Sequence, residues 1–480
     1  MKPKRATIYT LGCRLNHAES SLIAERLADA GYVLASSGEA ADVCVINTCT
    51  VTSEADAKSR KMIRAFVRKN PEAFVAVVGC YAELAAEAIA GIPGVDLVLG
   101  TQNKLDVLEY ISESKNPTPI VVRREIDTGG FTIPLCGSNA PTRTARSQVQ
   151  LGNERANSNA PTRRLGHRAN LKIQDGCNQW CSYCVVPAAR GPARSRDFDN
   201  TIAEAKSLAE RGTKEIVLTG VNVGAYNGNG HTLLDVVDGL NELAGIRRIR
   251  LSSIELLAVP EGLVERMADP SHALVPFLHL PLQSGSDRIL DRMGRGYKAE
   301  TFREFVQSAV DGVPDLCVGV DVLVGFPGES QTDFDDTCHT LQESPIAYAH
   351  VFKYSDRKGT AAAGMGDKLD PTTLHRRSER ARKISQEKRR TFHERYLGKC
   401  VEVLFEERDK GSFVPLVPKL NLGTSYWWGY TGNYIRVAAC SNVSLENAVR
   451  DVIIAADCGE YVGGALVEAG LDKDEVHGDT

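Results

Sequence analysis

Three cysteines in the run LKIQDGCNQWCSYCVVPAARG constrain this chain more than any other feature. Cys177, Cys181 and Cys184 are spaced C-x3-C-x2-C and directly follow residues 170–174, which read as a short strand. Three thiolates at this spacing can hold three irons of a [4Fe–4S] cube, whereas such clusters are ordinarily closed by four cysteines. The alternative is a zinc site, which prefers four Cys or His ligands. No fourth ligand sits nearby after Cys184 and His167 precedes the strand, so the spacing favours a cluster with one open iron.

An open iron can chelate the amino and carboxylate groups of S-adenosylmethionine (SAM). Electron transfer from the cluster then splits the sulfonium and yields a 5′-deoxyadenosyl radical. We therefore interpret Cys177, Cys181 and Cys184 as the catalytic cluster ligands of a radical SAM site. Tyr183, next to the last of these cysteines, is expected to pack on the adenine of SAM.

Beyond the cysteines, β-rich runs alternate with helical stretches. The runs are 215–218, 249–252, 277–280, 318–324 and 349–354. Such alternation implies parallel βαβ units. Together with the strand before the cysteines it predicts six strands in a partial barrel, where chemistry gathers at the C-terminal ends of the strands.

Polar residues or glycines stand at those strand ends. We expect six of them to contact SAM: Gly220, Asn222, Ser252, Glu255, Gln283 and Gly325. Glycine after a strand is usually only a turn residue, so the prediction rests on the recurrence of these residues at successive strand ends.

A second set of cysteines lies upstream, at Cys13 in TLGCRLN, Cys49 in VINTCTVT and Cys80 in AVVGCYAE. Each ends an apolar, β-rich run and precedes a helical stretch. In an open α/β sheet the carboxyl ends of the strands hold the ligands, so the fold could bring the three together. Two interpretations stay open at this point, a second three-cysteine cluster and three buried thiols, because Cys is commonly a small core residue.

The chain resembles the methylthiotransferases of the radical SAM family over residues 5–460. The motifs that carry the resemblance follow one another in the family's order: TLGCRLN, NTCTVT, VGCYAE, CNQWCSYC with PAARGPARSR, SSIE, HLPLQSG and GFPGE. The resemblance implies two [4Fe–4S] clusters and SAM as cofactors. It assigns the second cluster to Cys13, Cys49 and Cys80, as the one that supplies sulfur. The product would carry a methylthio group in place of an inert C–H.

Three branches of that family differ in a few residues around the shared cysteines. TLGCRLN, NTCTVT and PAARGPARSR are most similar to the branch that acts on N6-threonylcarbamoyladenosine beside the tRNA anticodon. The isopentenyladenosine branch tends to read GCQMN with a PYTRG run, and the ribosomal-protein branch GCPKN. The resemblance thus implies methylthiolation of C2 of N6-threonylcarbamoyladenosine, with the other two substrates as alternatives. A non-catalytic iron–sulfur RNA-binding protein is the alternative from another class.

Length and resemblance together imply an α/β protein of three domains. We expect an N-terminal open α/β methylthiotransferase domain at 5–125, a central partial (β/α)6 radical SAM barrel at 166–396, and a small C-terminal β-barrel at 397–462. By resemblance the last is a TRAM-like RNA-binding module.

Three segments depart from this pattern. Residues 126–165 contain SNAPTR twice and few apolar side chains, which predicts a disordered insertion or linker. A Pro-containing insertion near 411–425 interrupts the small barrel, and residues 463–480 read as a loose tail.

The charge distribution bears on RNA binding more than the net charge of -4 does. The stretches 58–69 and 376–395 are basic and read as helices, so they are candidates for binding phosphates. A solvated helix face is the alternative for each. Arg190, Arg194 and Arg196 follow the cluster loop, and we expect them to contact substrate or SAM.

Four aromatic residues of the small barrel are candidates for stacking on bases: Tyr426, Trp427, Trp428 and Tyr430. We expect at least two of them to be core residues instead. The implied chemistry also requires tRNA, an electron donor of the flavodoxin or ferredoxin kind, and a sulfur donor. The oligomeric state stays open between a monomer and a weak dimer.

The sequence favours a cytoplasmic location without a membrane segment. No apolar run approaches the roughly 18 residues that a membrane helix needs, and the first residues lack a secretory signal. Thirteen cysteines without an export signal suit a reducing compartment, where thiolates bind metal.

Overall fold

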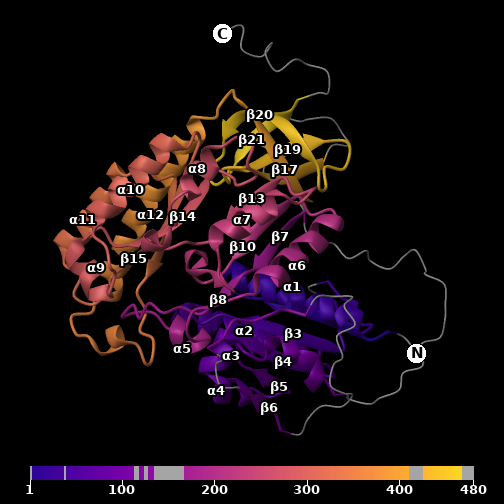
Figure 1. The fold of residues 1–480 in the computed structure, drawn as a ribbon. Coiled ribbons are helices and arrows are strands. Elements are labelled where there is room, and N and C mark those ends of the chain that lie inside the picture. The colour runs from indigo at the N-terminus through magenta and orange to yellow at the C-terminus, as the bar shows by residue number, and fades with distance from the viewer. Residues whose placement is uncertain are drawn as a thin grey trace.

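The computed structural model describes residues 3–36, 39–112, 118–123, 128–134, 167–409 and 425–467. Within them the chain forms an N-terminal parallel sheet with helices, a central partial barrel and a small C-terminal barrel (Figure 1). This arrangement confirms the predicted α/β fold class. In the described part of the chain, no helix is long and apolar enough to cross a membrane.

The N-terminal part is a six-stranded parallel sheet in the order β2-β1-β3-β4-β5-β6. Its strands are β1 (Arg5–Thr10), β2 (Val33–Leu34), β3 (Val43–Thr48), β4 (Phe74–Gly79), β5 (Leu97–Leu99) and β6 (Ile120–Val122). Its helices are α1 (Arg14–Asp29), α2 (Ser53–Lys69), α3 (Cys80–Leu84), α4 (Ala86–Ala90) and the 3-10 helix η1 (Lys104–Tyr110). Strands β3 and β4 are buried along their whole length, because helices cover both faces of a parallel sheet.

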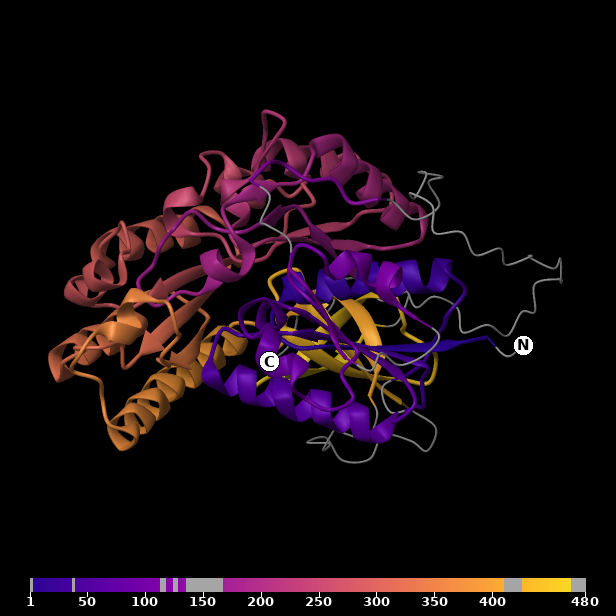
Figure 2. The ribbon, with the colours of Figure 1, turned by 90° about the horizontal axis from the view of Figure 1, so that it is seen from below.

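The central part has two three-stranded parallel sheets, ordered β7-β10-β13 and β14-β15-β16. A backbone hydrogen bond of 3.0 Å from Ile254 to His279 joins them, so the six strands curve into one partial barrel with helices outside (Figure 2). The strands are β7 (Arg168–Lys172), β10 (Glu215–Thr219), β13 (Arg248–Leu251), β14 (Phe277–Gln283), β15 (Cys317–Val324) and β16 (Tyr348–Lys353). All six predicted strands are therefore present.

Helices of the barrel follow its strands along the chain. They are α5 (Val186–Arg190), α6 (Phe198–Glu210), α7 (Leu233–Asn241), α8 (Leu263–Ala268), α9 (Asp287–Met293), α10 (Ala299–Gly312), α11 (Gln331–Glu343) and α12 (Pro371–Glu394). Short 3-10 turns follow three strands: η2 (Val223–Ala225), η3 (Leu256–Ala258) and η4 (Ala361–Gly364). Two small ribbons pair β8 (Gln174–Asp175) with β9 (Arg194–Ser195), and β11 (Asn227–Gly228) with β12 (His231–Thr232).

The C-terminal part is a closed barrel in the order β17-β18-β19-β21-β20. Its strands are β17 (Cys400–Arg408), β18 (Ser425–Thr431), β19 (Arg436–Ser441), β20 (Val449–Asp457) and β21 (Val462–Leu466). Strand β21 closes the barrel and runs to Leu466, so the module extends past the predicted boundary at 462. The predicted insertion near 411–425 lies outside the described residues except for Ser425, and so does the tail beyond 467.

The predicted linker at 126–165 includes a segment that packs on the central barrel. Phe131 donates a backbone hydrogen bond of 3.1 Å to Ser195, and Ile133 is buried. Residues 128–134 therefore belong to the folded part, against the sequence prediction. Both copies of SNAPTR lie outside the described residues.

Arginines from the central strands hold the C-terminal barrel in place. Arg248 donates to the backbone oxygen of Tyr430 at 2.8 Å and pairs with Glu402 at 2.9 Å. Arg168 pairs with Glu406 at 3.3 Å. Arg168 and Arg248 are the first residues of β7 and β13, so the C-terminal module is docked against the N-terminal ends of these strands.

Candidate active site

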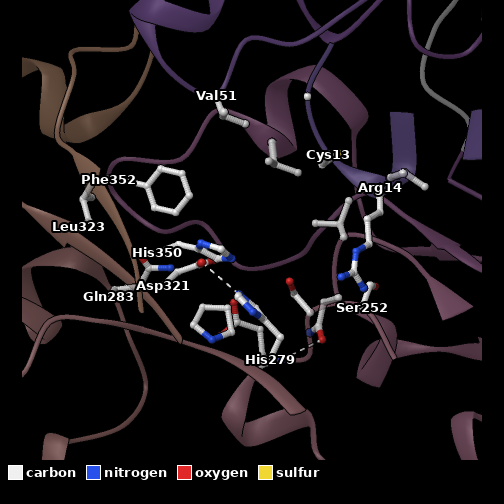
Figure 3. A pocket seen from close by; sticks show the side chains of 18 of the residues that line it. Cys13, Arg14, Val51, Ser252, His279, Gln283, Asp321, Leu323, His350 and Phe352 are labelled. Atoms are coloured by element: carbon white, nitrogen blue, oxygen red, sulfur yellow. Dashed lines mark hydrogen bonds and ion pairs between the residues drawn. The ribbon is translucent and has the colours of Figure 1, made fainter. Parts of the chain in front are cut away.

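One cavity of about 1120 Å³ collects both sets of cysteines. All six predicted ligands line it: Cys13, Cys49, Cys80, Cys177, Cys181 and Cys184. The N-terminal sheet, the central barrel and the C-terminal barrel all contribute to its wall. Figure 3 shows Cys13 and Arg14 on one side of this space and His279, Asp321 and His350 across from them.

The first set follows three neighbouring strands of the N-terminal sheet. Cys13 comes after β1, Cys49 after β3 and Cys80 after β4, which pair side by side. Glycines precede two of the cysteines and have positive φ angles, with Gly12 and Gly79 both at +101°. A Cβ atom on Gly12 would lie 2.8 Å from the sulfur of Cys49, so only glycine lets these two loops approach.

Buried thiols of this set have raised pKa values. Burial raises the pKa of Cys49 to about 11, and it also raises the pKa of Cys80. The charge of neighbouring Arg190 lowers the pKa of both thiols, against the effect of burial. A thiolate is the form that binds metal, so loading such a site releases protons. Three sulfurs at adjacent strand ends beside a cation fit an iron–sulfur cluster.

The second set lies on one loop after β7. The sulfur of Cys177 accepts a hydrogen bond from the backbone of Gln179 at 3.3 Å, and that of Cys184 from Val186 at 3.4 Å. Burial raises the pKa of Cys177, and raises that of Cys184 to about 12. Backbone N–H groups aimed at the sulfurs stabilise thiolates, so this loop fits a cluster as well.

Arg295, which follows α9, was not singled out by the sequence. Its guanidinium lies 3.5 Å from the sulfur of Cys181 and is ion-paired with Glu255. Glu255, which we expected to contact SAM, is therefore engaged by this arginine. The pair lies in the cavity wall beside the cluster loop.

Six of the predicted SAM contacts line the cavity with the cysteines: Tyr183, Gly220, Asn222, Ser252, Glu255 and Gln283. The hydroxyl of Ser252 is buried and has no hydrogen-bond partner within the described residues, so it suits a polar ligand. Gln283 has a left-handed φ of 67°, at an irregular register at the end of β14. Gln174 fixes the backbone that follows β10, because its side-chain oxygen accepts a hydrogen bond from the backbone N–H of Asn222 at 3.0 Å.

Gly325 does not line the cavity. Its backbone N–H donates to Glu329 at 3.0 Å, and a Cβ at this position would lie 2.2 Å from Leu374 of α12. The glycine therefore allows helix α12 to pack on the strand end, and its role as a SAM contact is not supported by its location.

The three arginines after the cluster loop are engaged in the protein. Arg196 is buried and pairs with Glu204, and Arg194 donates to Gln102 at 2.8 Å. Arg190 lies 2.9 Å from Asp175 and 3.1 Å from Glu19. Of the three, only Arg190 lines the cavity, so the expectation that Arg194 and Arg196 contact substrate or SAM is not supported by their location.

Arg190 belongs to a buried ion cluster at the junction of the N-terminal sheet and the central barrel. Glu19 also pairs with Lys104 at 2.5 Å and Lys172 at 2.8 Å, and Lys172 pairs with Asp175 at 2.6 Å. Burial alone would lower the pKa of Arg190, but Cys80, Glu19, Asp175 and Cys13 raise it well above its usual value. Arg194 also lies 3.6 Å from Asp175, so four cations against two carboxylates leave positive charge next to the Cys13/Cys49/Cys80 set.

His279, Asp321 and His350 form a further polar group on adjacent strands β14, β15 and β16. The Nε2 atom of His279 lies 3.0 Å from Asp321, and the three side chains offer ligand atoms within 4.8 Å of one another (Figure 3). Such a set could hold a divalent metal ion. His279 belongs to HLPLQSG, the motif that also contains Gln283, and the histidine itself was not singled out by the sequence.

The aromatic residues of β18 divide as expected. Trp427 and Trp428 are buried, which confirms that at least two of the four belong to the core. Tyr430 lines the cavity and is stacked on Tyr434 with ring centroids 4.9 Å apart. Tyr434 was not singled out by the sequence.

Comparison with known families agrees with this geometry. The model of the radical SAM superfamily matches residues 171–341, and that of an uncharacterized protein family, UPF0004, matches residues 5–100. The cluster loop and the partial barrel thus define a radical SAM enzyme, and its cofactors are SAM and a [4Fe–4S] cluster.

Proteins of similar sequence identify the family to which the chain belongs within this superfamily. The threonylcarbamoyladenosine tRNA methylthiotransferase MtaB of Bacillus subtilis is 37% identical over 98% of this chain and 98% of its own length. The protein of that name from Aquifex aeolicus is 36% identical, over 85% and 94%. A tRNA-2-methylthio-N(6)-dimethylallyladenosine synthase of Methylacidiphilum infernorum is 33% identical, over 84% of each chain. The chain belongs to the family of radical SAM tRNA methylthiotransferases.

Proposed function

We propose that the protein replaces the C2 hydrogen of N6-threonylcarbamoyladenosine, beside the anticodon of tRNA, with a methylthio group. The observation that carries this proposal is the single cavity into which both cysteine sets open. A reaction that removes hydrogen at one cluster and delivers sulfur from another needs both within reach of one carbon. The relatives named for threonylcarbamoyladenosine support this substrate over isopentenyladenosine.

Each cysteine set has a separate role in this proposal. Cys177, Cys181 and Cys184 would hold the cluster that binds SAM, and Cys13, Cys49 and Cys80 a second [4Fe–4S] cluster that carries the sulfur to be transferred. When these groups are bound, they supply a carbon-centred radical for hydrogen abstraction and a sulfur atom for C–S bond formation. Two of the three domains thus contribute cluster ligands, at 5–125 and at 166–396.

Residues of the barrel hold the reacting molecules. Ser252 and Asn222 would donate to the polar groups of SAM, while Tyr183 would cover its adenine. Arg295 holds Glu255 and lies beside Cys181, which fixes the wall next to the cluster. The buried ion cluster around Arg190 would stabilise the negative charge of thiolates at Cys13 and Cys80.

tRNA would bind across the exposed basic faces of α2 and α12. On α2 the exposed cations are Lys58, Lys61, Arg64, Arg68 and Lys69. On α12, Arg376, Arg382 and Lys383 are exposed, whereas Arg377 is buried against Glu329. An unpaired anticodon-loop base can be splayed into a cavity without melting a helix. A flavodoxin- or ferredoxin-like reductant, a sulfur donor and a second SAM, which would supply the methyl group, complete the reaction.

The experiment that tests this function gives anaerobically reconstituted enzyme three tRNAs. One carries N6-threonylcarbamoyladenosine, one carries isopentenyladenosine and one is unmodified at that position. Nucleoside analysis by mass spectrometry should find a methylthio product with the first alone. Equal turnover of the isopentenyl tRNA would refute the substrate assignment, and failure to cleave SAM under reduction would favour a non-catalytic RNA-binding protein.

A further inference from the structure

The arginines of the cavity fall into two groups. Arg190, Arg295 and Arg357 are paired with carboxylates of the protein, the last with Asp56 at 2.9 Å. Arg14, Arg389 and Arg436 line the same cavity, and within the residues that the structure describes none of the three has a carboxylate at ion-pair distance. Arg436 belongs to the C-terminal barrel and lies over the ring of Trp428, 3.9 Å from its centroid. A half-buried guanidinium without an internal partner is suited to an anion from outside.

Aromatic rings hold Arg14 and Arg389 in the cavity wall. The guanidinium of Arg14 lies 5.0 Å from the ring centroid of Tyr434, and that of Arg389 lies 5.4 Å from the ring of Tyr348. Cation–π contact fixes a guanidinium over a ring without neutralising its charge. The hydrogen-bond donors at its edge therefore stay available for a ligand.

The two charges act on the same part of the cavity, although they come from different domains. The ring of Tyr348, on which Arg389 lies, is 5.1 Å from the ring of His350. The ring of Tyr434, on which Arg14 lies, is 4.9 Å from the ring of Phe277, on the strand that carries His279. Arg14 begins α1 of the N-terminal sheet, whereas Arg389 lies near the end of α12. Two guanidiniums from different domains therefore lie beside the His279/Asp321/His350 group, which offers one carboxylate.

The chemistry of the substrate places an anion close to this region. Arg14 directly follows Cys13, a ligand of the proposed sulfur-carrying cluster. In adenine, C2 and the carbon that bears N6 flank one ring nitrogen, so a group on N6 lies near whatever attacks C2. The threonylcarbamoyl group ends in a carboxylate, whereas the isopentenyl group is uncharged.

We propose that Arg14 and Arg389 together bind the carboxylate of the threonylcarbamoyl group and thereby select this substrate over adenosines with a neutral N6 substituent. This inference rests on the proposed function and adds the residues that determine its specificity. Arginine suits the role because its planar donors match the two oxygens of a carboxylate.

Binding of anticodon stem-loop RNAs tests the inference without depending on turnover. The enzyme with reconstituted clusters is titrated, by fluorescence anisotropy, with RNAs that carry threonylcarbamoyladenosine, isopentenyladenosine or adenosine at the target position. Arg14→Gln and Arg389→Gln should each weaken binding of the first RNA by about ten- to hundred-fold, as expected for loss of a hydrogen bond to a charged group. The preference for the threonylcarbamoyl RNA over the other two should shrink by the same factor.

Control variants separate specificity from folding. Arg303→Gln removes a surface arginine of α10 that is paired with Glu300, and it should bind all three RNAs like the wild type. Arg14→Lys keeps the charge and should recover part of the preference. Cluster absorption and melting temperature show whether each variant is folded.

Two outcomes would overturn the inference. If Arg14→Gln and Arg389→Gln lose affinity equally for all three RNAs, the arginines bind backbone phosphate instead. If they keep the wild-type preference, the carboxylate is bound elsewhere. If the proposed function itself is wrong, the result differs from both of these. The wild-type enzyme would then show no preference for the threonylcarbamoyl RNA and form no product from it.

Discussion

The carboxylate of Glu19, on the helix that begins after Cys13, lies 2.8 Å from the ammonium of Lys172, on the strand that leads to Cys177. Both side chains are buried. This ion pair therefore connects the loop of one cysteine set with the loop of the other across the domain junction. Together with the contacts of Arg190 to Glu19 and Asn16, it joins the two domains that carry the cysteine sets.

Removal of the Glu19 charge should destabilise the protein strongly. Glu19→Gln leaves Lys104, Lys172 and Arg190 with one carboxylate, and loss of one partner from a buried pair costs about 3–5 kcal/mol. The free energy of unfolding in denaturant measures the effect. Glu39→Gln, which breaks an exposed pair with Arg5, is the control and should cost less than about 1 kcal/mol. Equal losses would show that the buried cluster contributes no more than a surface pair.

The same cluster should make stability depend on pH in the acid range. Burial alone would raise the pKa of Glu19 and of Asp175, but the neighbouring Arg190, Lys172 and Lys104 hold both pKa values well below the usual 4.5 and 3.8. Carboxylates whose pKa is depressed by folding stabilise the protein above their unfolded pKa, and this stability is lost as the pH falls.

We therefore expect the free energy of unfolding to decrease steadily below about pH 4.5. Glu19→Gln should show a shallower decrease, since one of the two carboxylates is absent. A variant whose acid dependence equals that of the wild type would contradict the assignment of this slope to Glu19.

Iron content should report the two cysteine sets separately. Reconstituted wild-type protein should hold about eight irons, because two cubanes are proposed. Replacement of Cys177, Cys181 and Cys184 by Ala should leave about four irons and abolish SAM cleavage. Replacement of Cys13, Cys49 and Cys80 should also leave about four while some cleavage persists. Loss of all iron in either triple variant would rule out two independent clusters.

Charge reversal on α12 should weaken tRNA binding if this helix binds phosphates. The suitable residues are Arg376, Arg382 and Lys383, which are exposed, whereas Arg377 is buried and its reversal would disrupt the fold. The triple change to Glu should raise the KM for tRNA and flatten its salt dependence, by about 0.9 in the logarithmic slope for each phosphate that the helix no longer neutralises. An unchanged slope, with normal iron content as the check on folding, would mean that tRNA binds elsewhere.

Ser252 should contribute directly to SAM affinity. Its buried hydroxyl has no partner among the described residues, so Ser252→Ala removes a donor that only a ligand would use. We expect the Kd for SAM to rise about two- to ten-fold, as for loss of one neutral hydrogen bond. Equilibrium binding of SAM to the reconstituted protein measures it, with the exposed Ser308→Ala on α10 as control. An unchanged Kd would show that the hydroxyl does not face SAM.

The sequence correctly predicted the features that depend on residues close together in the chain. Each cysteine of the first set ended a buried, β-rich run, so its place at a strand end followed from the sequence, and so did the six strands of the barrel. The pairing of charged side chains did not follow, because it depends on contacts between residues far apart in the chain. Arg190 follows the cluster loop and therefore resembled a substrate contact, yet its partner Glu19 lies on another domain.

Contacts between distant residues also explain the other incorrect predictions. Glu255 appeared available until the fold brought Arg295 to it, and Gly325 resembled a ligand-binding turn until α12 was seen to pack on it. Arg14 and Arg389 lie far apart in the chain, and nothing in either local sequence indicates that both line one cavity.

The left-handed backbone of Gln283 has a consequence for how this position would evolve. A residue with a side chain costs about 1–2 kcal/mol in this conformation, whereas glycine adopts it freely. Under selection for heat resistance alone, glycine should become fixed at this end of β14. Under selection for methylthio transfer, the amide that lines the cavity should persist despite its cost. Position 283 therefore allows the demands of folding and of catalysis on this barrel to be separated.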